Sequence, residues 1–216
     1  GGGIFVEDGA VLRLSNSIVR NNEIGSGEQG GGIHMSGGTM GFVHNTEIYE
    51  NIAMNSGGGI YADSPLYITN SIIRNNRCVN GTGNGLKARV YMYNCVVTQN
   101  GWTSENESGN TGDYSMTVLS NSRIWNSIIW GNYGDSKIQN NQNVHIDYSV
   151  IEGGLSDGID SPNIIWGDHN SSLDPQFNSP ESYDFTPNLQ TAGHVLNNGD
   201  PSQFFNNSDG TQNHIG

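Results

Sequence analysis

The sequence has 216 residues, of which 31 are Gly and 30 are Asn, whereas Ala occurs five times and Lys twice. The strongest helix formers are therefore scarce, and a mainly α-helical fold is excluded. The formal net charge is −13 with only eight Lys and Arg, so the chain repels nucleic acid and anionic lipid, and we expect neither as a partner. No apolar run approaches the ~18 residues that span a bilayer, so we expect no membrane insertion.

A seven-residue motif recurs through the first 154 residues. Its copies start at Asn16, Asn45, Asn70, Asn94 and Asn126, with a degenerate copy at Tyr148. The starts are 29, 25, 24, 32 and 22 residues apart. A Gly-rich segment precedes four copies, at residues 1–4, 30–33, 57–60 and 83–86. A fixed motif at unequal spacing predicts one coil of a repeat structure per copy, with connecting loops of different length.

Apolar and polar residues alternate on both sides of the first motif residue, which we number position 0. Positions −2 and +3 are apolar in all six copies, whereas positions −3, −1 and +4 are mixed. This period of two predicts half-buried strands, and its change of phase at position 0 predicts a bend with the position-0 Asn and the small position +1 residue inside. We therefore predict an all-β, right-handed parallel β-helix, a solenoid in which inward Asn side chains form a ladder from coil to coil.

The repeat predicts two regions. Residues 1–154 form the coils, and residues 155–216, with five of the six prolines, form an irregular C-terminal cap or tail that packs on them. Residue 1 already lies inside a complete coil, and solenoids need capped ends. We therefore expect further coils before it, which would also account for the lack of a signal peptide.

The rhythm of GGGI followed by NSIIRNN, with the tail segments at 126–132, 173–177 and 198–201, is similar to that of secreted bacterial proteins with right-handed parallel β-helix repeats, found in Bacteroidetes-like bacteria. This resemblance covers essentially the whole chain. It implies the fold and an extracellular or bacterial cell-surface location. It implies no single activity, because the fold carries lyases, hydrolases, adhesins and uncharacterised surface proteins.

One row of outward residues is aromatic. Phe42, Tyr67 and Tyr91 occupy position −3 of successive copies, and Tyr93 and Trp125 occupy position −1 beside them. Rings one coil apart can stack on successive sugar rings, so these five residues are the predicted glycan-binding residues. Aromatic neighbours can also simply stabilise a sheet, by ~0.2–1 kcal/mol per pair.

A second row follows the Gly-rich segments and contains His34, Tyr61, Lys87 and Arg89. A polysaccharide lyase needs cations that neutralise a uronate carboxylate and a base that removes the adjacent proton, so these four are the candidate catalytic residues. Arg89 could equally form an ordinary surface ion pair with Asp63.

A third row, at position +2, is aliphatic except for Glu47, and it comprises Ile18, Ile72, Val96, Ile128 and Val150. Apolar stripes of this length are seldom left in water. We expect the tail to cover the stripe, with a protein partner or self-association as the alternative.

Together these features predict a non-catalytic extracellular module that binds a polysaccharide in the manner of an adhesin. The alternatives are a polysaccharide lyase or glycoside hydrolase, and a structural filament or surface-layer component. We expect no cofactor and no metal site, although the acidic turns at Asp157, Asp160 and Asp209 could hold Ca²⁺. Cys78 and Cys95 are not expected to form a disulfide.

Overall fold

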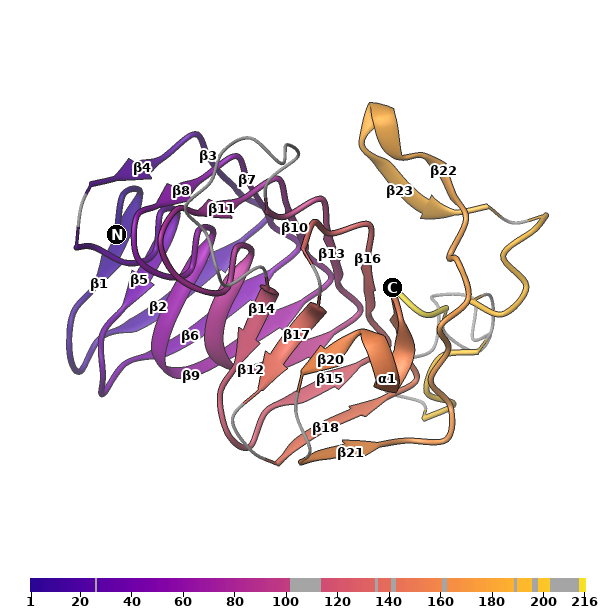
Figure 1. Ribbon diagram of the computed structural model, residues 1–216. Coiled ribbons are helices and arrows are strands. Elements are labelled where there is room, and N and C mark those ends of the chain that lie inside the picture. Colours follow the sequence, from indigo (N-terminus) through magenta and orange to yellow (C-terminus); the bar gives the residue numbers. More distant parts are fainter. Residues whose placement is uncertain are drawn as a thin grey trace.

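The computed structural model describes residues 1–25, 27–101, 114–134, 136–140, 143–160, 163–188, 190–195, 198–202 and 214–216. The chain is an all-β parallel solenoid of about six turns (Figure 1), which confirms the predicted fold class. Among the described residues the only α-helix is the short α1 (Gly154–Asp157). Within the same residues, no helix has the length and hydropathy needed to cross a bilayer.

Strands of successive turns pair in parallel and form four ladders. The first two ladders share one twelve-stranded sheet, because β9 and β12 run through both of them. The first ladder comprises β1 (Ile4–Val6), β5 (Ile33–Met35), β9 (Ile60–Thr69), β12 (Leu86–Tyr93), β14 (Tyr114–Val118), β17 (Ser136–Asn140) and β20 (Ile159–Asp160). The second comprises β2 (Val11–Ser15), β6 (Met40–His44), the same β9 and β12, β15 (Arg123–Trp125), β18 (Val144–Asp147) and β21 (Ile164–Trp166).

The other two ladders close the coil. The six-stranded third ladder comprises β3 (Ile18–Arg20), β7 (Glu47–Tyr49), β10 (Ile72–Arg74), β13 (Val96–Thr98), β16 (Ile128–Trp130) and β19 (Val150–Ile151). The three-stranded fourth ladder comprises β4 (Glu23–Ile24), β8 (Ile52–Ala53) and β11 (Arg77–Cys78). The residues at position +3 of all six copies are buried between the ladders, and those at position −2 are buried except for the half-buried Leu14, so the predicted core is confirmed.

Each turn bends at two corners where the backbone is left-handed. The angle φ is positive at position 0 of all six copies, from 46° at Asn45 to 54° at Asn94, and again at position +5. Asn tolerates this conformation better than most residues do, which explains its recurrence there. The side chains of Asn16, Asn45 and Asn70 are exposed at this corner. The prediction that the position-0 Asn points inward is therefore wrong for these copies, and Asn126, which is buried, accepts a hydrogen bond from the tail at Asp200 N. Position +1 does point inward, as Ser71 shows.

The inward ladder lies six residues further along each copy. Asn22, Asn51, Asn76, Asn100 and Asn132 each occupy the same place in successive turns. The Nδ2 of each donates to the Oδ1 of the next, at 2.9, 2.9, 3.1 and 3.0 Å along the series. An Asn ladder inside the solenoid is thus confirmed, but it is built by the last residue of the motif instead of the first.

The Gly-rich segments pack directly against this ladder. Gly57, the first Gly of its triplet, has a φ of 64°. A Cβ on Gly59, the third, would lie 2.9 Å from the side chain of Asn76 and 2.5 Å from the carbonyl oxygen of Gly85. The first position therefore needs a left-handed bend, and the third needs the absence of a side chain.

The tail begins later than the repeat motif indicates. β20 pairs with β17 and β21 pairs with β18, so both lie on the solenoid although they follow Gly154. After Ser171, which forms a bridge with Val150, the chain leaves the ladders. It then forms the antiparallel pair β22 (Phe177–Ser179) and β23 (Asp184–Pro187), which are joined through the 3-10 helix η1 (Pro180–Ser182). The strand pair lies at the upper right of Figure 1.

Candidate functional site

The aromatic residues at position −3 form a continuous stack on the second ladder. Phe42 and Tyr67 lie in register on β6 and β9, and Tyr91 follows on β12. The ring centroids are 5.2 Å and 4.7 Å apart, and the ring planes differ by 13° and 12°. The rings therefore cover one another's faces. Any ligand beside them meets the ring edges and the hydroxyl groups of Tyr67 and Tyr91.

A pocket of about 290 Å³ lies at the Tyr91 end of this stack. Arg123 is in register with Tyr91 on the next strand, and His145 is in register with Arg123 on the strand after that. The pocket is lined by Tyr91, Asn121, Ser122, Arg123, Asn143, His145 and Ile165. The stack thus ends in a concave site that combines an aromatic ring, a guanidinium, an imidazole and two amides. We call the stack and this pocket together the aromatic site.

Tyr93 and Trp125, the other two predicted binding residues, are in register on β12 and β15. Both are half-buried. The Trp125 ring packs edge-on against His145, with 4.4 Å between the centroids. This contact links the position −1 row to the imidazole that lines the pocket, so the structure brings Trp125 to the edge of the aromatic site.

The row that follows the Gly-rich segments brings three of the four candidate catalytic residues together. His34, Tyr61 and Lys87 are in register on β5, β9 and β12. The His34 and Tyr61 rings are 5.2 Å apart, and the Lys87 Nζ lies 5.9 Å from the centroid of the Tyr61 ring. Arg89 follows Lys87 by two residues on β12, but it is not in register with the row, because the register shift after Ala88 pairs it with Pro65 instead of Asp63.

The protonation states of this row follow from burial. The Tyr61 hydroxyl donates to Asp63 Oδ1 at 2.6 Å. Burial, with this hydrogen bond, raises the pKa of Tyr61 to about 12, so its phenol stays protonated at neutral pH. Burial lowers the pKa of His34, so its imidazole is held neutral more strongly than a free histidine. Asp63 is engaged by Tyr61, and the ion pairs of the described residues do not include one between Asp63 and Arg89.

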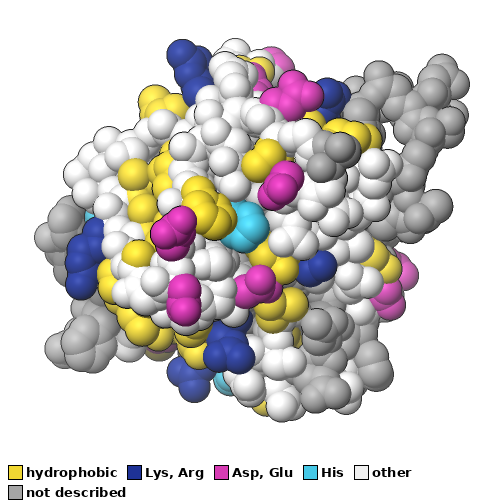
Figure 2. Space-filling model, turned by 90° about the vertical axis from the view of Figure 1, so that its left-hand side faces the viewer, with side chains coloured by type: hydrophobic (Ala, Val, Ile, Leu, Met, Phe, Trp, Pro, Cys, Tyr) yellow, Lys and Arg dark blue, Asp and Glu magenta, His cyan; other side chains and the backbone are white. Residues whose placement is uncertain are grey.

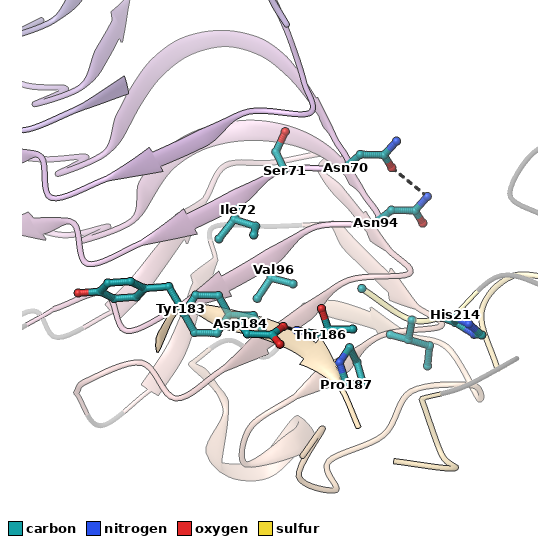
Figure 3. Close-up of a pocket in the computed structure, with 13 residues that line it drawn as sticks. Asn70, Ser71, Ile72, Asn94, Val96, Tyr183, Asp184, Thr186, Pro187 and His214 are labelled. Carbon is teal, nitrogen blue, oxygen red and sulfur yellow. Dashed lines mark hydrogen bonds between the residues drawn. The ribbon is translucent and has the colours of Figure 1, made fainter. Parts of the chain in front are cut away.

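A groove of about 460 Å³ lies where the tail meets the third ladder. Figure 3 shows Ile72 and Val96 facing Asp184, Thr186 and Pro187 of β23, with Asn70 and Asn94 at one side. Asn94 Nδ2 donates to Asn70 Oδ1 at 3.2 Å. A smaller hollow of about 320 Å³ continues the groove past Asn70 toward Ile18. The groove has an aliphatic floor and a rim of amide side chains. These groups can pack against a ligand or a chain segment, but they are poor proton donors and acceptors for catalysis.

The aliphatic stripe is covered over its C-terminal half. Val96, Ile128 and Val150 are buried against the tail residues Phe185, Ala192, Val195 and Ile215. Ile72 is half-buried, and Ile18 is 60 % exposed. The tail therefore covers the stripe where the two overlap.

No group of three or more His, Cys, Asp or Glu within the described ranges is arranged to hold a metal ion. The Asp209 turn lies outside those ranges. Cys78 and Cys95 are buried and form no disulfide, and burial raises the pKa of both thiols, to about 12 for Cys95. Neither is therefore an accessible thiolate.

The sequence patterns do not identify Arg123, His145, Asn121 or Asn143 as site residues. Arg123 and His145 occupy position −3, the same row as the three stacked rings, so the row continued from aromatic into basic residues. The two Asn residues lie outside the motif and come to the pocket only through the left-handed bends, at φ values of 64° and 53°, that precede β15 and β18.

No protein-family model, no curated protein and no solved structure matches this chain.

Proposed function

We propose that this chain is a non-catalytic extracellular module that binds a glycan at the aromatic site. The observation that carries the proposal is the three-ring stack that ends in a pocket lined by a guanidinium, an imidazole and two amides. Glycan sites combine flat aromatic surfaces with a few polar groups that fix orientation. The extracellular location rests on the sequence resemblance described above.

The arrangement favours a particular mode of contact. The Tyr91 face on the Tyr67 side is covered by that ring, while the opposite side adjoins Arg123 and the pocket. A sugar ring seated in the pocket would meet Tyr91 as its apolar wall and the amides of Asn121 and Asn143 as hydrogen-bonding groups. Neighbouring sugar units would lie along the edges and hydroxyls of the stack.

The test is binding of a panel of neutral and acidic oligosaccharides, measured by titration calorimetry. Tyr91→Ala should weaken the best-bound oligosaccharide at least ~10-fold, because it removes the wall of the pocket. Tyr133→Ala is the control, since Tyr133 is an exposed tyrosine that lies outside the aromatic site. Equal affinity of Tyr91→Ala and wild type, with both folded by circular dichroism, would reject the proposal.

The lyase alternative is less well supported by the chemistry of its row. Tyr61, with its pKa near 12, is a poor base at neutral pH, and its partner Asp63 is already hydrogen-bonded to it. Formation of unsaturated uronate products, lost in Lys87→Ala, would favour the lyase over a binding module. The filament alternative would need the aliphatic stripe for contacts between copies. Little of that surface remains for such contacts, because the tail covers Val96, Ile128 and Val150.

A further inference from the structure

The face that carries the aromatic site has the opposite charge balance to the rest of the chain. The whole sequence has 21 acidic and eight basic residues. The strand segments around the stack are Val11–Ser15, Met40–His44, residues 65–69 and 89–93, Arg123–Trp125 and Val144–Asp147. These segments contain three arginines, Arg13, Arg89 and Arg123, and one acidic residue, Asp147. Three of the eight basic residues of the chain therefore gather on one sheet face.

None of these three arginines forms an ion pair with a described acidic side chain. The charged contacts among the described residues join Arg74 to Glu47, Lys137 to Glu152 and, when the histidine is protonated, His169 to Asp147. The last of these, at 3.2 Å, engages the one acid on the face with a histidine of the following turn. All three arginines are exposed, so their charges are available to a ligand.

The arginines lie at both ends of the stack. The Arg13 guanidinium lies 4.9 Å above the Phe42 ring at one end. Arg123 is in register with Tyr91 and lines the pocket at the other end. Arg89 precedes Tyr91 by two residues on β12, and period-two alternation places both side chains on the same face. Arg13 and Arg123 are four strands apart, a span of ~19 Å at ~4.8 Å per strand.

We propose that the glycan bound at the aromatic site is anionic, a chain of uronate sugars that lies along the solenoid axis with a carboxylate on Arg123. This inference rests on the proposed function and names its ligand class. The planar guanidinium can bind a carboxylate with two parallel hydrogen bonds, which favours a carboxylate-bearing sugar. The aromatic edges and the amides of the pocket bind the remainder of each sugar unit, and Arg13 and Arg89 hold further carboxylates along the chain.

The net charge of −13 on the whole chain does not prevent an anionic glycan from binding at the aromatic site. At physiological ionic strength the Debye length is ~8 Å, so distant acidic residues act weakly on a ligand beside the arginines. On the end of the molecule shown in Figure 2, acidic and basic side chains are interspersed with apolar ones. The face around the stack differs, because its strand segments contain three arginines and one acidic residue.

The experiment compares a hexamer of glucuronic acid with its fully methyl-esterified form, which has the same backbone and no charge. We expect the acid to bind at least ~10-fold tighter than the ester, and Arg123→Gln to remove most of that difference between the two ligands. Arg20→Gln is the matched control, because it removes one exposed arginine from the third ladder and should change neither affinity.

The outcomes separate this inference from the proposed function. Equal binding of acid and ester by wild type would overturn the anionic ligand and leave a glycan-binding module. Binding of neither hexamer, together with no binding to the wider panel, would overturn both. Tighter binding of a single-stranded hexanucleotide than of the hexauronate would also overturn the inference, since stacked rings and arginines can bind nucleic acid as well.

Discussion

Asparagine has two different functions at the corners of this solenoid. At position 0, Asn70 adopts a φ of 50° with its side chain in solvent. At position +6, the Asn76 side chain is fully buried and its amide is saturated. Asn76 Nδ2 donates to the carbonyl oxygen of Ile48 at 2.8 Å and to Asn100 Oδ1 at 3.1 Å. Its Oδ1 accepts from the backbone and side chain of Asn51. The first use is conformational, and the second holds the interior together.

Asn76→Asp should lower the free energy of unfolding by about 3 kcal/mol, because it replaces two buried donors with a carboxylate oxygen that faces two acceptors, Ile48 O and Asn100 Oδ1. Asn70→Asp should change it by less than about 0.5 kcal/mol. Aspartate tolerates the left-handed backbone there and still accepts the bond from Asn94. Urea denaturation of both variants checks this. A similar loss in both would show that the two corners contribute equally.

At the scale of elements, the tail is held on the third ladder by an apolar seam and by one cation. Phe185 and Val195 pack with Val96, Ile128 and Val150. The Arg74 guanidinium is sandwiched between the Tyr49 ring of the ladder, at 3.8 Å, and the Tyr183 ring of the tail, at 4.0 Å. Outward aliphatic residues that would otherwise face water thus become the attachment surface of the tail.

Val195→Asp should detach this segment, because it places a charge in a seam where Val195 is fully buried. We expect residues after Ser171 to become susceptible to limited proteolysis, with cleavage sites located by mass spectrometry. Leu173→Asp is the control, since Leu173 lies in the same tail but is 62 % exposed. Proteolysis of Val195→Asp at the wild-type rate would show that other contacts suffice to hold the tail.

At the scale of the whole molecule, each turn contacts only the turns before and after it, so stability varies along the axis. The middle turns have both neighbours, and Ile60, Ile68 and Ile73 are completely buried there. In the first turn, the inward residues Leu12 and Leu14 are only half-buried. The aromatic site begins in the middle turns and extends to Ile165 of β21, so most of it lies on turns that have a neighbour on each side.

Hydrogen exchange of the 216-residue chain should follow this gradient. Backbone amides of β9, β10 and β12 should exchange at least ~10-fold more slowly than those of β1 to β3, because local opening of an end turn disrupts one interface and opening of a middle turn disrupts two. Exchange measured by mass spectrometry over peptides of each turn checks this. Uniform protection along the chain would mean that the solenoid opens only as a single cooperative unit.

The sequence by itself determined the repeat, the strands and their inward faces. Positions −2 and +3 had to be inside because six copies with the same alternation leave no other common face, and the small residues at position +1 follow the same logic. The sequence also placed Phe42, Tyr67 and Tyr91 in one row. It could do so because a parallel ladder stacks equivalent positions directly above one another.

Only the tertiary structure decided which corner is inside. The motif begins and ends with Asn, and alternation alone cannot tell an extra inward residue from an extra outward one in a left-handed bend. The register shift after Ala88, which pairs Arg89 with Pro65 instead of Asp63, arises because Asp63 and Ser64 of β9 have no partner on β12. The pocket beside Tyr91 likewise depends on how the bends at Asn121 and Asn143 bring non-repeating residues together. Repetition specifies what is common to all turns, whereas the site arises where the turns differ.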